Sequence, residues 1–229
     1  MFAGNDVSRV VPVVKQATNA LQGRDRCSRT DVEEAMRMAF QHQLIEKQTD
    51  SVLARYGLNM AEFLGTGLSN FGEAIFSAMK YQLDQIQLDC SFLIFGRDEL
   101  GDAHILTVED PGVVCNHDLY GFWAIGSGAN RALSSLFFQH YNIATVEWKA
   151  LYYIAEAKFM AEGSGVGDKT LVLIKRRNGH SVACLSSRLL KNLWQDKGQP
   201  KIPTETEATV AASLEKEFIE LSPPELPPT

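Results

Sequence analysis

The order of apolar runs and turns within residues 122–176 constrains the fold more than any other feature of the sequence. An apolar run at 122–125 ends in Gly126-Ser127-Gly128, a pattern typical of a sharp strand-to-helix turn because glycine tolerates unusual backbone angles. Two segments of helical periodicity follow, and Thr145 is a suitable N-cap for the second. Residues 170–175 are typical of a buried strand. We therefore expect two helices, joined by a short turn, on a sheet made from the flanking strands.

The segment before this region predicts an antiparallel hairpin. Residues 90–95 form a dense apolar run, a charged turn follows, and residues 103–108 return as a second run. Asp110-Pro111-Gly112 has turn chemistry, and residues 113–115 can pair as a further strand. We expect His104 on the surface of this sheet.

Capping patterns predict long helices nearer the N-terminus. Thr30 and Glu33 form a capping box, and the helix that they begin is expected to end at Gly57. Asn59 and Glu62 form a similar pattern at the start of a helical stretch that glycines interrupt.

The first residues predict a strand followed by a helix. Met1-Phe2-Ala3-Gly4 has the character of a strand end, and a helical pattern then continues as far as Gly23. Pro12 lies within that pattern and removes one backbone donor, so the helix either starts late or is kinked.

The C-terminal part predicts one more hairpin. Asn178-Gly179 is a strong two-residue turn signal that joins residues 171–175 to residues 181–184. A short helix at 187–194 is expected to follow.

Length and composition indicate one domain with a tail. A chain of 229 residues with 45% hydrophobic residues can bury a substantial core. The sequence becomes acidic and proline-rich near its end. We therefore expect a domain at 1–197 and a flexible tail at 198–229, in which residues 208–219 could form a helix.

Charge and cysteine usage exclude several classes of function. The formal net charge of −6 argues against nucleic-acid binding, which needs clustered Lys and Arg. The four cysteines are scattered, which favours reduced thiols in a cytoplasmic protein. No apolar run approaches the roughly 20 residues that span a membrane, and no signal peptide opens the chain.

Cys115, His117 and Asp118 are of metal-ligand types, but no second ligand pair accompanies them at metal-site spacing. We expect no metal site and no cofactor, and we place His117 and Asp118 in a loop.

The ordered set of these features resembles the proteasome-type subunits, which belong to the N-terminal-nucleophile hydrolases. The resemblance rests on Phe2-Ala3-Gly4 before a helix, on the hairpin, on Gly126-Ser127-Gly128, and on the two later helices followed by Ser164 and a strand. It implies an α+β fold, a four-layer α-β-β-α sandwich, from which the N-terminal strands are missing. We expect an incomplete coding sequence, an expressed fragment or a subunit that has lost those strands. A complete small domain of another fold is the alternative.

The resemblance also implies a function, peptide-bond hydrolysis by a threonine peptidase subunit within a cytoplasmic assembly. The family's nucleophile is a chain-terminal threonine, and no residue of this chain occupies that place, so the chain is expected to be inactive. By resemblance, Gly4 is the oxyanion candidate, and Ser127 and Ser164 are supporting candidates. All three could instead serve only as turn residues.

Two positions depart from the family's pattern: Ser8 and Ala161 stand where aspartates are usual. One alternative function is therefore a non-catalytic structural subunit of a proteasome-like assembly, and another is an unrelated α/β binding module. The expected partners are homo- or hetero-oligomeric ring subunits, with a peptide substrate if the chain is active. Neither a nucleic acid nor a membrane is an expected partner.

Overall fold

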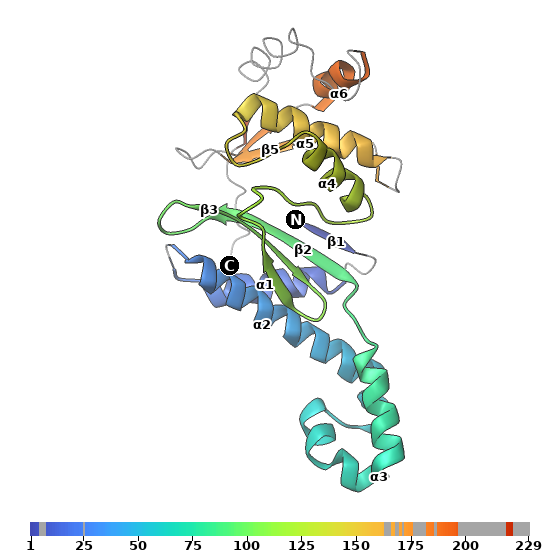
Figure 1. The fold of residues 1–229 in the computed structure, drawn as a ribbon. Coiled ribbons are helices and arrows are strands. Elements are labelled where there is room, and N and C mark those ends of the chain that lie inside the picture. Colours follow the sequence, from blue (N-terminus) through green and yellow to red (C-terminus); the bar gives the residue numbers. More distant parts are fainter. Residues whose placement is uncertain are drawn as a thin grey trace. The chain divides into compact units, whose positions relative to one another are not determined.

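The computed structural model shows an α+β chain that forms two units, residues 1–119 and residues 120–229 (Figure 1). The α+β class expected from the sequence is confirmed. Among the described residues, no helix combines the length and the apolar character that a membrane span requires. The structure describes residues 1–4, 8–24, 26–162, 166–167, 170, 172–175, 182–185, 187–196 and 219–221.

The first unit contains a four-stranded antiparallel sheet in the order β1-β2-β3-β4. The register places Phe92 of the second strand opposite both Phe2 and Val108. The predicted strand at the N-terminus, the hairpin and the strand at 113–115 are therefore confirmed. The strands are β1 (Phe2–Gly4), β2 (Cys90–Arg97), β3 (Ala103–Glu109) and β4 (Val113–Asn116).

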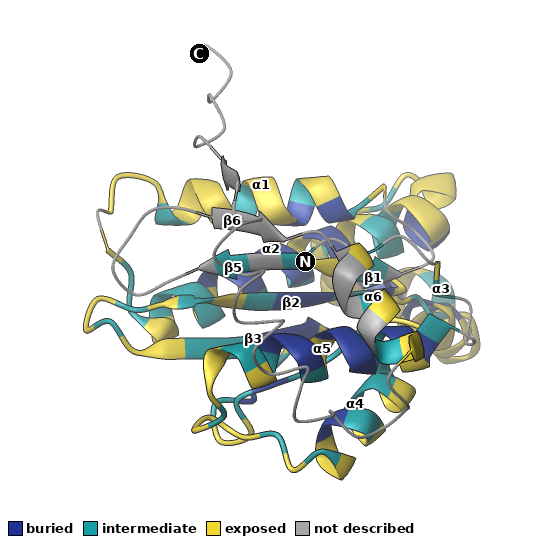
Figure 2. Cartoon of the chain, turned by 90° about the horizontal axis from the view of Figure 1, so that it is seen from above, coloured by how far each residue is buried: buried dark blue, intermediate teal, exposed yellow. Residues whose placement is uncertain are grey.

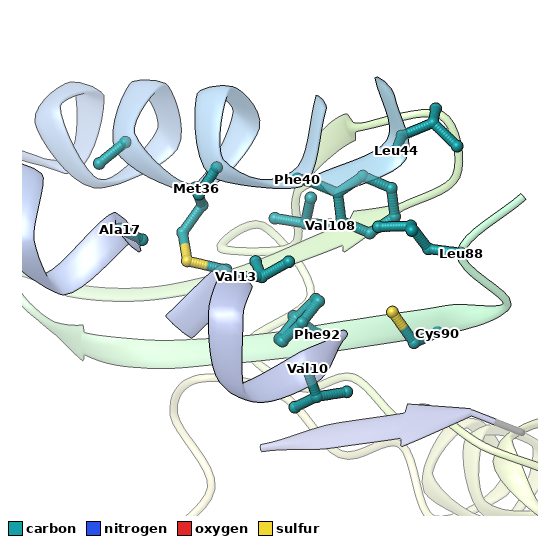
Figure 3. Close-up of a cluster of buried hydrophobic side chains, with 12 residues drawn as sticks. Val10, Val13, Ala17, Met36, Phe40, Leu44, Leu88, Cys90, Phe92 and Val108 are labelled. Carbon is teal, nitrogen blue, oxygen red and sulfur yellow. The ribbon is translucent and has the colours of Figure 1, made fainter. Parts of the chain in front are cut away.

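Two helices, α1 (Val10–Leu21) and α2 (Arg29–Gln48), pack on one face of this sheet (Figure 3). Phe40 of α2 is fully buried and meets Phe92 edge to face, with the ring centroids 6.1 Å apart. Buried positions also follow β2 and β3 in Figure 2. The helix α1 starts late, so Pro12 lies in its first turn, where backbone N–H groups have no partner within the helix.

The cap of α2 differs from the prediction. Ser28, not Thr30, is the N-cap: its side chain accepts from the Asp31 backbone, and Asp31 accepts from the Ser28 backbone at 3.0 Å. The predicted end is confirmed, because helical turns continue to Tyr56 and Gly57 follows with a left-handed φ of 68°.

A long helix, α3 (Met60–Asp84), forms the extension at the lower end of unit 1 in Figure 1. Asn59 and Glu62 form the predicted capping box. Of the glycines expected to interrupt the helix, only Gly72 does so, with a φ of 75°. The two halves then fold against each other, and the rings of Phe63 and Phe76 stack with centroids 4.8 Å apart.

The second unit pairs helices with a three-stranded sheet in the order β5-β6-β7. The predicted hairpin pairing and the helix from 187 are confirmed, but Val146 replaces Thr145 as the N-cap before α5. The other tail positions, including 208–218, lie outside the described residues. The elements are α4 (Ala129–Phe138), α5 (Glu147–Ala161), β5 (Val172–Lys175), β6 (Val182–Leu185), α6 (Ser187–Asp196) and β7 (Ile219–Leu221).

The strand predicted at 122–125 is wrong, because these residues have no strand structure. Phe122 is instead buried in an aromatic cluster, 5.1 Å from the ring of Phe137 and 5.3 Å from that of Tyr141. The two segments that flank the helices therefore do not share a sheet as expected: residues 122–125 form no strand, and β5 pairs with β6.

We expect Phe40→Ala to lower the free energy of unfolding by about 3–5 kcal/mol, because it leaves a cavity against Phe92. Met38→Ala is the matched control on the same helix, where the side chain is 54% exposed, and it should change that free energy by no more than about 0.5 kcal/mol. Urea denaturation measures both. Equal effects of the two substitutions would show that Phe40 does not hold the helices to the sheet.

Candidate functional site

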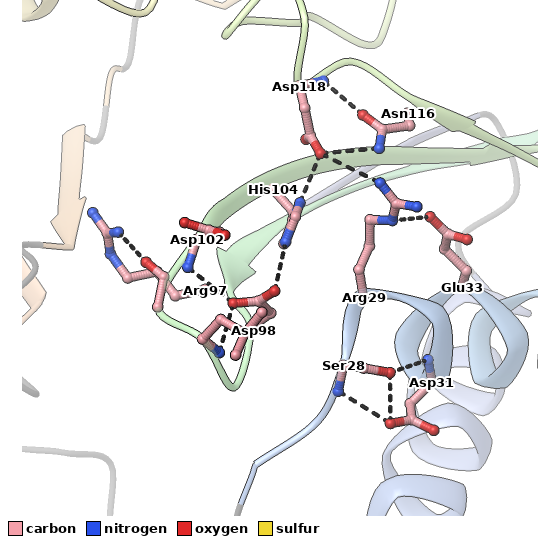
Figure 4. Close-up of polar contacts among 12 residues, drawn as sticks. Ser28, Arg29, Asp31, Glu33, Arg97, Asp98, Asp102, His104, Asn116 and Asp118 are labelled. Atoms are coloured by element: carbon pink, nitrogen blue, oxygen red, sulfur yellow. Dashed lines mark hydrogen bonds and ion pairs between the residues drawn. The ribbon is translucent and has the colours of Figure 1, made fainter.

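The best-defined polar cluster of unit 1 lies where the β2–β3 hairpin, the end of β4 and the start of α2 converge (Figure 4). Its members are Asp98 in the hairpin turn, His104 in β3, Asp118 just after β4 and Arg29 at the start of α2. The strand register sets Gly96 opposite His104 and so brings the turn residue Asp98 within hydrogen-bond distance of the His104 ring.

Both ring nitrogens of His104 face a carboxylate. Nδ1 lies 2.6 Å from Oδ2 of Asp118, and Nε2 lies 3.2 Å from Oδ2 of Asp98. Ionised carboxylates only accept hydrogen bonds, so the ring satisfies both contacts as the imidazolium, which alone donates from both nitrogens. The hydrogen bond to Asp118 raises the pKa of His104, partial burial opposes this effect, and the bond to Asp98 adds to it.

Backbone groups hold Asp98 in place. Its Oδ1 accepts from the N–H groups of Leu100 and Asp102, each at 2.9 Å. The pKa of Asp98 is lowered chiefly by the hydrogen bond from His104, and these backbone donors contribute further.

Asp118 is fixed by several donors. It accepts from the backbone N–H of Ile105 at 2.8 Å and from the side-chain amide of Asn116 at 2.9 Å, and Arg29 lies 3.9 Å away. Burial alone would raise the pKa of Asp118, but the bonds from His104, Ile105 and Asn116 outweigh it and lower that pKa. The cluster is therefore a charged clasp between the sheet and α2.

A hollow of about 130 Å³ adjoins the clasp. Pockets that hold drug-sized ligands usually measure about 300–1,000 Å³, and one water occupies about 30 Å³ in the liquid. The hollow therefore suits a few waters and is too small for a peptide substrate. Its lining includes Cys27, Arg29, Ile94, Arg97, Asp98 and His104.

Two hydroxyls among the described contacts of unit 1 lie against possible bases, but neither pair has the geometry of an accessible nucleophile. The Ser28 hydroxyl donates to Asp31 at 2.8 Å within the helix cap. Thr107 Oγ1 lies 2.9 Å from His117 Nε2, and both residues are buried. Burial lowers the pKa of His117, so this buried pair is best understood as part of the sheet's core.

The structure places Ser127, exposed, at the tip of the predicted turn. Gly126 has a φ of 94°, which glycine tolerates, and its carbonyl accepts from the N–H of Ala129 at 3.0 Å. A Cβ on Gly128 would lie 2.7 Å from the Ala161 Cβ and 2.5 Å from Val166. The turn therefore packs closely against Ala161 and Val166.

The other two predicted site residues are placed differently. Gly4 ends β1, where it pairs with Cys90, so the predicted strand end before a helix is present. Ser164 lies outside the described residues. Gly4 belongs to unit 1 and Ser127 to unit 2, so neither unit by itself brings the predicted residues together.

Comparison with known proteins adds no relative: no protein-family model matches the sequence, and no curated protein is significantly similar to it. The sequence alone does not predict the clasp, because it places His104 on a sheet surface, Asp98 in the hairpin turn and Asp118 in a separate loop. The signal that could have found it is the hairpin register, which follows from the two apolar runs.

We expect the clasp to make unit 1 less stable as pH rises. The folded-state pKa of His104 is raised, so its stabilising effect is complete below the ordinary value of 6.5 and is lost as pH rises through the folded value. His104→Asn should flatten the dependence of the unfolding free energy on pH above 6.5. Denaturant unfolding at several pH values measures this.

His140→Asn is the matched control for that experiment. His140 is exposed in unit 2 and has a φ of 53°, which asparagine tolerates. The control should retain the pH dependence of the natural chain. If the unfolding free energy of His104→Asn falls with pH as steeply as that of the natural chain, the clasp does not contribute to stability.

We expect Gly128→Ala to lower the free energy of unfolding by about 1–3 kcal/mol, because the added methyl overlaps Ala161 and Val166. Gly65→Ala is the control within α3: no atom lies within 4 Å of its Cβ, and it should raise stability by about 0.5–1 kcal/mol. Denaturant unfolding of both variants tests the packing of the turn. If Gly128→Ala leaves the free energy of unfolding unchanged, the close packing of the turn is contradicted.

Proposed function

We propose that this chain is a proteasome-like subunit with the four-layer α-β-β-α sandwich fold of the N-terminal-nucleophile hydrolases. In this proposal it acts as a structural subunit of a cytoplasmic oligomer and supplies framework and contacts. The catalytic reading, a threonine peptidase subunit that cleaves peptide bonds, is the second candidate. The order of elements in the sequence favours either one over an unrelated binding module.

The observation that carries the proposal is the apolar character of both faces of the first sheet. Cys90, Phe92 and Val108 point to the core beneath α1 and α2. Because side chains alternate along a strand, Leu93 and Phe95 of β2 belong to the opposite face, where their cross-strand partners are Thr107 and Ile105. An antiparallel sheet with one solvated face would carry polar residues there. A second apolar layer over that face accounts for the pattern.

The second unit has the composition that such a layer needs. Leu151, Tyr152, Ala155 and Phe159 of α5 form a core with Val172 and Ile174 of β5. One sheet with helices on one face thus occurs in each unit, and each supports one half of the proposed sandwich.

The site geometry favours a structural role over catalysis. Amide hydrolysis by a hydroxyl requires an activated nucleophile within reach of a base. The Thr107–His117 pair is buried, and the Ser28 hydroxyl is used in a helix cap. The ionic cluster around His104 links secondary-structure elements and adjoins a hollow too small for a peptide.

Exposed apolar side chains support assembly. Leu64 and Leu68 lie one helical turn apart on α3 and are 62% and 54% exposed. Phe137 and Phe138 of α4 are also largely exposed. Contiguous exposed apolar patches on soluble proteins mark interaction sites such as subunit interfaces.

We expect light scattering at micromolar concentration to give a mass that is a multiple of 25.4 kDa. Replacing Leu64 and Leu68 by serine should shift the protein toward the monomer, because it removes apolar contact area from an interface. Met38→Ser, which removes an exposed apolar side chain from α2 instead, should leave the assembly intact.

A monomeric natural chain would contradict the proposal. Loss of assembly in the Met38 variant alone would place the interface on α2. The assembled protein should also fail to cleave a fluorogenic peptide, and cleavage that a covalent inhibitor of hydroxyl nucleophiles abolishes would select the peptidase instead.

A further inference from the structure

Glu156 is a buried acid between two helices of unit 2. It lies on α5, is 1% exposed, and faces α4. Its Oε1 accepts from the side-chain amide of Gln139 at 2.7 Å and from the hydroxyl of Ser135 at 3.4 Å. Its Oε2 is buried and has no hydrogen-bond partner in the described part of the chain. A buried carboxylate with one unsatisfied oxygen is costly, and the neutral acid costs less because it carries no charge.

The groups around Glu156 offer it no described cation. Along its length, α4 carries one charged residue, Arg131, and that residue is exposed. The titratable neighbours on α5 are Tyr152 and Tyr153, whose pKa values are raised by burial and further by the charge of Glu156. Tyr141, just after α4, is a further phenol, and burial raises its pKa too.

Two lysines near Glu156, one on α5 and one on α6, form ion pairs with a different acid. Lys158 of α5 and Lys191 of α6 donate to Glu162, at 2.5 Å and 2.9 Å. Burial therefore raises the pKa of Glu156, and the bonds from Gln139 and Ser135 oppose this only in part.

We propose that Glu156 is a proton-dependent latch between α4 and α5: the neutral acid closes the helix pair, and loss of its proton loosens α4. The latch acts near the C-terminal end of α4, whereas close packing at Gly128 holds the N-terminal end. Loss of the proton therefore releases the last turns of α4 first, around Ser135 and Gln139. The latch is independent of whether the chain belongs to a peptidase.

The sign of the effect follows from proton linkage. The folded unit binds the proton more tightly than the unfolded chain, so stability falls as pH rises above the ordinary pKa of 4.5, and it levels off above the raised folded value. For one proton, the equilibrium between closed and open helix changes by at most about tenfold per pH unit across that window.

The experiment is hydrogen–deuterium exchange of the full chain between pH 5 and pH 8, corrected for the intrinsic pH dependence of exchange. Peptides that cover residues 129–141 should lose protection as pH rises, by up to about tenfold per pH unit. Glu156→Gln should abolish this fall, because the amide resembles the neutral acid. Glu156→Met, which removes the titrating group altogether, should abolish it too.

Glu147→Gln is the matched control, an exposed acid in the first turn of the same helix. It should retain the fall in protection. If Glu156→Gln does not fold, the Met variant decides the question. Protection that falls equally in the natural chain and in a folded Glu156 variant, or that does not fall in the natural chain, would overturn the latch.

Discussion

The packing of β2 against α2 is the interaction on which the rest of unit 1 depends. Phe92 meets the buried ring of Phe40 on one face of the sheet, and the register opposite Val108 follows from that contact. A shift by one residue would turn Leu93 toward the helices and Phe92 away from them. The same register carries His104 to the position where Asp98 can reach it, so the hydrophobic core also determines the geometry of the polar clasp.

Features set by neighbouring residues could be predicted from the sequence. The capping box at Asn59 and the left-handed end at Gly57 depend only on side chains and angles within one turn. The start of α2 was missed because residues 28–33 offer two overlapping capping boxes. The earlier start places Arg29 against Asp118 from another part of the chain, and a local pattern does not show that contact.

Features that depend on distant contacts could not be predicted. Residues 122–125 are as apolar as a buried strand, but Phe122 packs among Phe137 and Tyr141, and that cluster satisfies its burial without a sheet partner. Apolar character alone does not distinguish the two outcomes. The glycines on both sides of Ser127 predict the turn, whereas the close approach of Gly128 to Ala161 and Val166 is visible only in three dimensions.

The two attachments of α4 differ in kind, and this difference explains how one end of the helix can respond to pH while the other does not. At Gly128 the helix lies so close to Ala161 that the contact is purely steric, and neither residue has a group that titrates. Near the other end, loss of the proton from Glu156 leaves a buried negative charge with one unpaired oxygen, which is less favourable than the neutral acid. Because the turn that presents Ser127 lies at the steric end, it should keep its conformation when the latch opens. Any chemistry or contact that depends on Ser127 is thereby insulated from the titration of Glu156.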